Sequence, residues 1–224
     1  MPEGDTIDIT VVSSSIANAY LLKTAAGFIL IDTGFSWQRG KLRKTLETAG
    51  CKPGDLKLVV ITHADFDHTG NCAWLQKKYK APIAIHRAES PVVERGRMLL
   101  SRKNQRGVFA RLMVDVMGIF IFRRFKPDVY IDEGDNLSRY GLDARIYHIP
   151  GHSMGSIGIL VSSGDFFCGD LLTNEKKPDK STLVDDAAEM DASIERLKSL
   201  DIKIIYPGHG RPFTMAEYTR HHPE

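Results

Sequence analysis

The fold of this chain is decided by the stretch Leu56-Lys57-Leu58-Val59-Val60-Ile61-Thr62-His63-Ala64-Asp65-Phe66-Asp67-His68. Its first half is an apolar run of the kind that forms a buried strand. Its second half places four side chains that can bind a metal within six positions, where that strand should end. Packing several ionisable groups at a strand end costs free energy unless cations or hydrogen bonds compensate. The stretch therefore predicts a metal site at the edge of a sheet.

Three further candidate ligands follow other predicted strands, and each has glycine beside it. Glycine lets the backbone turn tightly and present one side chain at the sheet edge. The motifs are Pro150-Gly151-His152-Ser153-Met154-Gly155, Gly169-Asp170 and Pro207-Gly208-His209-Gly210. The complete candidate set is four imidazoles and three carboxylates: His63, Asp65, Asp67, His68, His152, Asp170 and His209. Seven ligands are too many for one tetrahedral zinc ion and suit two metals that share a carboxylate.

The rest of the chain alternates predicted strands and helices in two halves. Apolar runs predict strands over residues 7–12, 19–22, 27–31, 83–85, 129–131, 144–149, 156–161, 165–168 and 203–206. Helical spacing predicts helices over residues 37–49, 70–79, 89–125 and 186–200. Strands followed by a helix, repeated in two halves, indicate sheets packed between helices. Without a Pro-rich linker or low-complexity tract, we expect one domain over residues 1–224 with a helical, basic insertion over residues 87–126.

The composition is typical of a soluble globular protein, with 42% hydrophobic and 26% charged residues. The three cysteines are odd in number and form no CxxC pair, which argues against a disulfide framework. The N-terminal Met1-Pro2-Glu3-Gly4-Asp5 lacks the apolar core of a signal peptide. No run of about 18 apolar residues predicts a membrane span. We therefore expect a cytoplasmic protein.

The insertion is strongly basic, because residues 95–126 contain nine basic residues and one acid, Asp115. Either this segment is a solvated basic face, or it attracts an anionic substrate or an acidic surface. Its apolar part, residues 108–122, is too short to span a bilayer. The favoured interpretation is a helical lid over the site, and the next is a homodimer contact through residues 108–122. Adsorption to a membrane surface is the least favoured interpretation.

The motifs and their order resemble those of the metallo-β-lactamase-fold hydrolases, from Asp32-Thr33-Gly34 to Pro207-Gly208-His209-Gly210. The resemblance implies a four-layer αββα sandwich built from two similar halves. It implies that a first metal is held by His63, His152 and Asp170, and a second by Asp67, His68, Asp170 and His209. Asp170 would bridge the two ions. A metal-bound hydroxide would be the nucleophile, and Asp67 would be the catalytic proton carrier as well as a ligand.

Asp65 departs from the commonest pattern of this family, His-x-His-x-Asp-His. Asp65 could ligate the first metal directly, bind it through a water, or be too short to reach it; we favour the first two. A carboxylate at this position favours iron or manganese relative to zinc. The di-iron domains of flavodiiron proteins are similar here, since they carry Glu. We expect two divalent metal ions, with zinc as the first choice and iron or manganese as alternatives.

The turn Asp32-Thr33-Gly34 also spells the triplet of aspartic proteases, but it occurs once and a predicted helix follows it. A turn, or a carboxylate that orients a metal ligand, is the better interpretation. Cys168 and Tyr206 lie close to predicted ligands in the sequence, yet we expect both to pack in the core.

The expected function is hydrolysis of a small-molecule ester, thioester, lactone or phosphoester. The basic insertion favours an anionic substrate. Members of the family that process DNA or RNA carry large extra domains that would not fit into 224 residues, so we expect no nucleic-acid partner. The alternative is a di-iron redox protein that acts on oxygen, nitric oxide, or a thiol or persulfide. Asp65 keeps this alternative open.

Overall fold

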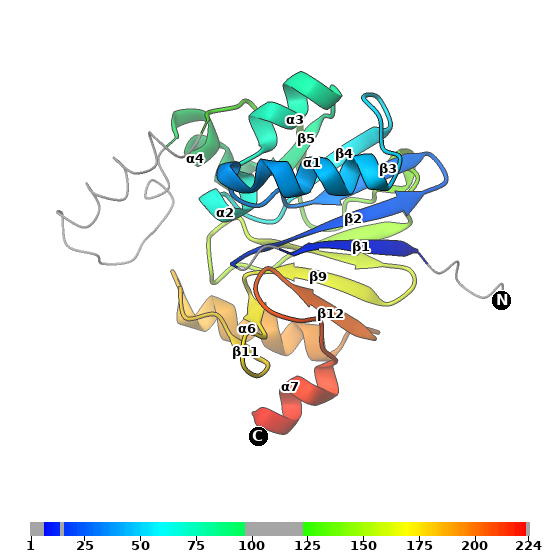
Figure 1. Cartoon of the computed structure of the whole chain (residues 1–224). Coiled ribbons are helices and arrows are strands. Elements are labelled where there is room, and N and C mark those ends of the chain that lie inside the picture. The colour runs from blue at the N-terminus through cyan, green and yellow to red at the C-terminus, as the bar shows by residue number, and fades with distance from the viewer. Residues whose placement is uncertain (1–6, 14–15, 97–122, 223–224) are drawn as a thin grey trace.

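Two main sheets lie between two layers of helices in the computed structural model, which describes residues 7–13, 16–96 and 123–222 (Figure 1). The first sheet has six strands in the order β1 (Asp8–Ser13), β2 (Asn18–Thr24), β3 (Gly27–Ile31), β4 (Leu56–Ile61), β5 (Ile83–His86) and β6 (Val129–Ile131). The second sheet has four strands in the order β12 (Ile204–Pro207), β9 (Asp165–Gly169), β8 (Ile157–Val161) and β7 (Ala144–His148). The αββα sandwich expected from the sequence is therefore confirmed.

The helices cover the outer faces of the two sheets (Figure 1). On the side of the first sheet lie α1 (Arg39–Thr48) and α3 (Cys72–Tyr79), and on the side of the second lie α6 (Ala187–Lys198) and α7 (Met215–His221). Five short helical segments are η1 (Ser36–Gln38), α2 (Phe66–Thr69), η2 (Arg87–Glu89), α4 (Ser90–Arg95) and η4 (Ser138–Tyr140). Among the described helices, none has the length and apolar character needed to cross a membrane.

Three hydrophobic clusters fill the spaces between the four layers. The first joins α1 and α3 to the outer face of the first sheet and includes Leu30, Leu46 and Leu75. The second lies between the two sheets and includes Val60 and Phe167. The third joins the second sheet to α6 and α7. Each sheet is thus buried on both faces, which explains why the central strands read as continuous apolar runs.

Strand β4 shows how this arrangement follows from the sequence. Because successive side chains of a strand point to opposite faces, Val59 and Ile61 pack toward the helices. Leu58 and Val60 pack between the sheets. All four side chains are fully buried. The apolar run ends at Ile61, so the polar residues that follow leave the sheet at its edge.

The structure corrects several expected boundaries. The predicted helix over residues 70–79 begins later, at Cys72, and the separate turn α2 precedes it. In α2 the Asp65 carbonyl accepts hydrogen bonds from the amides of His68 and Thr69, both at 3.0 Å. The sequence analysis also missed α7 and the short pair β10 (Leu172–Thr173) and β11 (Asp179–Lys180).

The helical insertion is described only in part. Helix α4 ends at Arg95, and Gly96 follows in the left-handed conformation with φ of 68°. The helix predicted over residues 89–125 starts as expected, since α4 begins at Ser90, but residues 123–125 form no helix. Residues 97–122 lie outside the described residues, and with them lie most of the basic segment and the proposed dimer contact through 108–122. The expectation of one domain over residues 1–224 stays a prediction.

Candidate functional site

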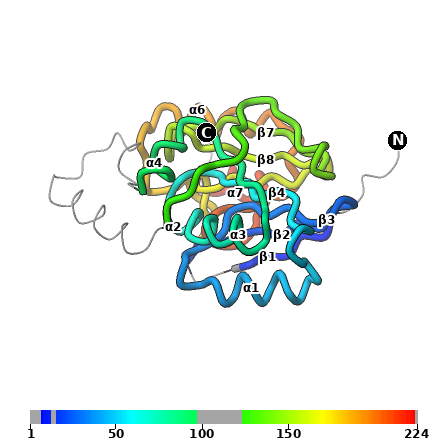
Figure 2. The backbone as a smooth tube through the Cα atoms, turned by 90° about the horizontal axis from the view of Figure 1, so that it is seen from above, coloured from blue at the N-terminus to red at the C-terminus, as the bar shows by residue number. Residues whose placement is uncertain are grey.

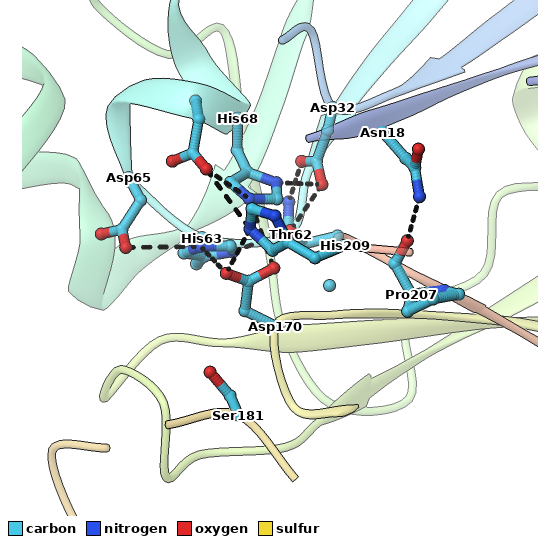
Figure 3. A network of polar contacts seen from close by, with 12 residues as sticks. Asn18, Asp32, Thr62, His63, Asp65, His68, Asp170, Ser181, Pro207 and His209 are labelled. Atoms are coloured by element: carbon cyan, nitrogen blue, oxygen red, sulfur yellow. Dashed lines mark hydrogen bonds and ion pairs between the residues drawn. The ribbon is translucent and has the colours of Figure 1, made fainter. Parts of the chain in front are cut away.

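The seven candidate ligands come from four loops that meet at one edge of the sandwich (Figure 3). The stretch from His63 to His68 follows β4 of the first sheet, whereas His152, Asp170 and His209 follow β7, β9 and β12 of the second. Strands β9 and β12 are parallel, and β7 runs in the same direction because both β7 and β9 pair antiparallel with β8. The carboxyl ends of these three strands therefore lie at the same edge of their sheet.

A first group of side chains consists of His63, His152 and Asp170. Their potential ligand atoms all lie within 4.8 Å of one another. The Asp170 Oδ2 atom is 3.8 Å from His63 Nε2 and 3.9 Å from His152 Nε2. All three residues are buried. These spacings fit atoms that face one common ion at about 2.0–2.2 Å each.

A second group consists of Asp67, His68 and His209. His209 Nε2 lies 3.3 Å from Asp67 Oδ2, and His68 Nε2 lies 3.7 Å from the same oxygen. Asp170 borders this group too, with Oδ1 at 3.3 Å from His68 Nε2 and Oδ2 at 3.1 Å from His209 Nε2. The carboxylate of Asp170 thus lies between the two groups, in the place expected for a bridge.

Asp65 lies beside the first group. Its Oδ2 atom is 3.2 Å from His152 Nε2 and 3.7 Å from His63 Nε2. The residue is 5% exposed, and its carboxylate points toward the histidines (Figure 3). Asp65 therefore reaches the ring atoms of the first group, and its side chain does not point away into solvent.

The four imidazoles share one orientation: each uses Nδ1 for a hydrogen bond away from the centre and turns Nε2 inward. Three of the four partners of Nδ1 are carbonyl or carboxylate oxygens, which can only accept, so Nδ1–H is the donor. The fourth partner is a threonine hydroxyl whose own hydrogen is donated to Asp32. The acceptors are Thr62 Oγ1 at 2.9 Å for His63, Asp32 Oδ2 at 2.8 Å for His68, the Leu183 carbonyl at 2.7 Å for His152, and the Ile16 carbonyl for His209. This arrangement is typical of metal-binding histidines, whose outer partners fix the tautomer and the ring.

Asp32 orients His68, as one of the two sequence interpretations predicts. Its Oδ1 atom accepts from the Thr62 amide at 2.9 Å, and Oδ2 accepts from Thr62 Oγ1 at 2.8 Å as well as from His68. Because Thr62 Oγ1 donates to Asp32, it is left to accept from His63 Nδ1. Asp32 is 2% exposed and has φ of 57°, a left-handed conformation that Asp tolerates better than most residues. One carboxylate thus holds a histidine of each group, directly or through Thr62.

The residues present fit divalent metal ions. Among the described residues, the buried atoms His63 Nε2, His68 Nε2 and Asp170 Oδ1 make no hydrogen bond. Such atoms cost free energy unless another partner compensates. Gly208 leaves room beside them, because a Cβ there would lie 2.1 Å from Asp170 Oδ1 and 2.7 Å from His68 Cε1. Imidazole and carboxylate donors together suit zinc, iron and manganese.

The electrostatics of the cluster favour cations. Burial lowers the pKa of His63, whereas the carboxylates of Asp170 and Asp32 hold the pKa of His68 well above its usual value against the effect of burial. Burial also acts to lower the pKa of His209, but hydrogen bonds to Asp170 and Asp67 raise it to about 10. In the absence of a metal, His209 therefore carries a second proton at neutral pH, which a metal ion would have to displace.

The sequence analysis missed two buried polar residues near the site. Asn18 is 3% exposed, and its Nδ2 atom donates to the carbonyls of Pro207 and Gly210 at 3.1 and 2.8 Å, which holds the loop of His209 (Figure 3). Glu89 is 1% exposed and accepts hydrogen bonds from two loops of the site. Neither residue belongs to a recognisable motif, so a single sequence offers no signal for them.

Cys168 and Tyr206 are placed as expected. Cys168 is buried in the cluster between the second sheet and α6, and burial raises the pKa of its thiol to about 12. The ring of Tyr206 stacks on Phe167 with ring centroids 4.8 Å apart and contacts Tyr20 edge-on. Both residues contribute to packing beneath the site.

Comparison with known proteins finds relatives that match most of the chain. A protein of Mycobacterium leprae is 29% identical over 92% of each chain, and bovine acyl-coenzyme A thioesterase MBLAC2 is 25% identical over 90% of this chain and 75% of its own. The crystal structure of TTHA1623 in a di-iron-bound form superimposes with a TM-score of 0.73 at 27% identity and covers 95% of this chain and 97% of that one. The sequence profile of the metallo-beta-lactamase superfamily matches residues 14–209. The chain belongs to the metallo-beta-lactamase superfamily.

Proposed function

We propose that this protein is a metal-dependent hydrolase that holds two divalent metal ions at the edge of the sandwich where the loops of the two sheets meet. The observation that carries the proposal is the common orientation of the four imidazoles, with Nδ1 anchored outward and Nε2 facing three carboxylates. We assign the first ion to His63, Asp65, His152 and Asp170. The second ion is assigned to Asp67, His68, Asp170 and His209.

Charge balance supports two ions. Asp32, Asp65 and Asp170 are buried carboxylates, and Asp67 is the fourth carboxylate in contact with the histidines. Four negative charges at such short separations repel one another unless cations neutralise them. Two divalent ions supply four positive charges and compensate them in full.

Divalent ions at these positions would lower the pKa of a water to near neutrality and polarise a carbonyl or phosphoryl oxygen of the substrate. Asp67 and His209 lie on the more open side of the cluster, with 18% and 19% of their side chains exposed. The carboxylate of Asp67 can therefore exchange a proton with the reacting water or the leaving group at that side. His63, His68 and His152 are fully buried and serve to bind and orient.

The proposed substrates are small esters, thioesters, lactones and phosphoesters, and anionic ones among them. A thioester is the first to test, because the bovine relative is named an acyl-coenzyme A thioesterase. The assay is a panel of one substrate from each class with protein whose metal content has been measured. No turnover of any class by protein that carries two metal equivalents would contradict the hydrolase proposal.

The metal proposal is tested with His68→Ala. We expect this variant to lose the metal of the second position and to lose hydrolysis, because His68 Nε2 faces both Asp67 and Asp170. His221→Ala is the matched control, since His221 is exposed on α7 and outside both groups. Near-wild-type turnover of metal-quantified His68→Ala protein would show that the assignment is wrong.

A second candidate function is a di-iron redox protein. It is favoured by the carboxylate of Asp65 beside His152, and by the di-iron-bound state of TTHA1623. Elemental analysis of protein purified without added metal distinguishes the two candidates. Iron with a visible absorption band would support the redox function, whereas zinc would support the hydrolase.

A further inference from the structure

Glu89 is a buried carboxylate for which the proposed hydrolysis has no use. It closes the short segment η2 directly before α4 and is 1% exposed. Its Oε2 atom accepts a hydrogen bond from the Ala64 amide at 3.0 Å, and its Oε1 atom accepts from the Gly155 amide at 2.9 Å. Hydrogen bonds to a carboxylate are among the stronger ones in proteins. The two oxygens of one side chain thus bind two different loops.

Both loops carry ligands of the first group. Ala64 lies between His63 and Asp65, and Gly155 lies three residues after His152. The first loop leaves the first sheet and the second loop leaves the second sheet. A backbone hydrogen bond already joins the two sheets before His63: the Ile157 amide, at the start of β8, donates to the carbonyl of Thr62, which follows β4, at 3.0 Å. Glu89 supplies a further connection, on the far side of His63.

The approach of Glu89 to the second loop depends on Gly155. A Cβ at Gly155 would lie 2.7 Å from Glu89 Cγ, 2.9 Å from Glu89 Oε1 and 2.8 Å from His86 Nδ1. Contacts this short do not occur in relaxed structures, so any larger residue would push the loop and the carboxylate apart. Helices α2 and α4 lie at the same end of the molecule in both views, opposite the N-terminus (Figures 1 and 2). Glu89 therefore acts where the first group is built.

We propose that Glu89 is a positioning residue, which sets the spacing between the loop of His63 and Asp65 and the loop of His152. Metal ligands must lie within a few tenths of an ångström of their best positions, so a change of loop spacing weakens binding. The effect should fall mainly on the first position, because Glu89 holds the residue between His63 and Asp65. The histidines of the second group lie further away along the chain, in α2 and in the loop after β12. This inference rests on the proposed metal-dependent function.

The test is Glu89→Gln. The amide keeps one oxygen acceptor but turns an NH2 group toward a backbone N–H, so either Ala64 or Gly155 loses its partner. First-position zinc affinity is measured in a His209→Ala background and second-position affinity in a His152→Ala background. We expect the first affinity to fall about ten- to hundredfold and the second to stay within about threefold. Gly155→Ala should give the same selective loss from the other side of the contact.

Glu94→Gln is the matched control, because Glu94 is exposed on α4, which follows Glu89 directly, and accepts from Ser90 Oγ at 2.9 Å. It should leave both affinities unchanged. A second readout needs no metal: the amides of Ala64 and Gly155 in metal-free Glu89→Gln protein should exchange with solvent faster than in wild type. Unchanged exchange, or equal loss at both metal positions, would overturn the inference. If wild-type protein bound no zinc, the proposed function would fail, while the amide exchange would still decide whether Glu89 holds the two loops.

Discussion

Asp32→Asn tests the idea that a carboxylate outside both groups controls metal affinity. Asp32 accepts three hydrogen bonds, from the Thr62 amide, Thr62 Oγ1 and His68 Nδ1, at 2.8–2.9 Å. Asparagine has nearly the same shape and tolerates the φ of 57° found at this position. It replaces one acceptor oxygen by an NH2 donor that faces another donor. At least one bond to a charged acceptor is therefore lost.

The structure sets the expected magnitude. A hydrogen bond to a charged group contributes about 1.5–3 kcal/mol, so we expect metal-free Asp32→Asn protein to lose about that much free energy of unfolding. Without the carboxylate, His68 is less firmly held and its Nε2 is a weaker donor to a metal. Loss of such an outer partner typically weakens metal binding about ten- to hundredfold.

The assay is competition for zinc against a chromogenic chelator, together with urea unfolding of the metal-free protein. Asp55→Asn is the matched control, because the Asp55 carboxylate accepts from the exposed Lys52 amide just before β4, at the end of that strand away from the site. A zinc affinity of Asp32→Asn within threefold of wild type would refute the reasoning, even if the variant were less stable.

Three further predictions concern the same centre. Gly208→Ala should remove metal from both positions, because its Cβ would lie 2.1 Å from Asp170 Oδ1; elemental analysis checks this, and full occupancy would contradict it. Thr62→Val removes the acceptor of His63 Nδ1 and should weaken the first position about tenfold; an unchanged affinity in zinc titrations would show that this hydrogen bond is unimportant. The pKa of His209 is raised to about 10, so its proton is present at pH 7 and must leave when a metal binds. Zinc affinity should therefore rise with pH, and calorimetry in buffers of different ionisation enthalpy should detect proton release; binding without release would refute this.

Much of the fold was predictable because burial on both faces leaves a clear pattern. Strands such as β4 read as apolar runs, and their ends are marked by glycine and polar residues. Helix α7 also had a signal that the sequence analysis did not use. Thr214 and Glu217 form a capping box, in which each side chain bonds the backbone of the other. The end of α4 at Arg95 was not predictable from the apolar pattern that follows it in the sequence.

The outer partners of the histidines were mostly beyond sequence reasoning. The carbonyls of Ile16 and Leu183 accept from His209 and His152 through the backbone, which every residue type offers. The residue types at these two positions therefore do not indicate this role. Asp32 was foreseeable because a lone carboxylate in a turn beside a strand suggests a residue that orients a ligand.

The ligand types, the strands that precede them and the superfamily could all be read from the sequence, and the resemblance to the family implied two groups with Asp170 between them. The tertiary structure was needed for the distances within each group and for the position of Asp65, which faces His152. The physical reason is that β4 belongs to one sheet, whereas β7, β9 and β12 belong to the other. Distances across the site depend on how the sheets pack and on contacts such as those of Glu89, which no local pattern encodes.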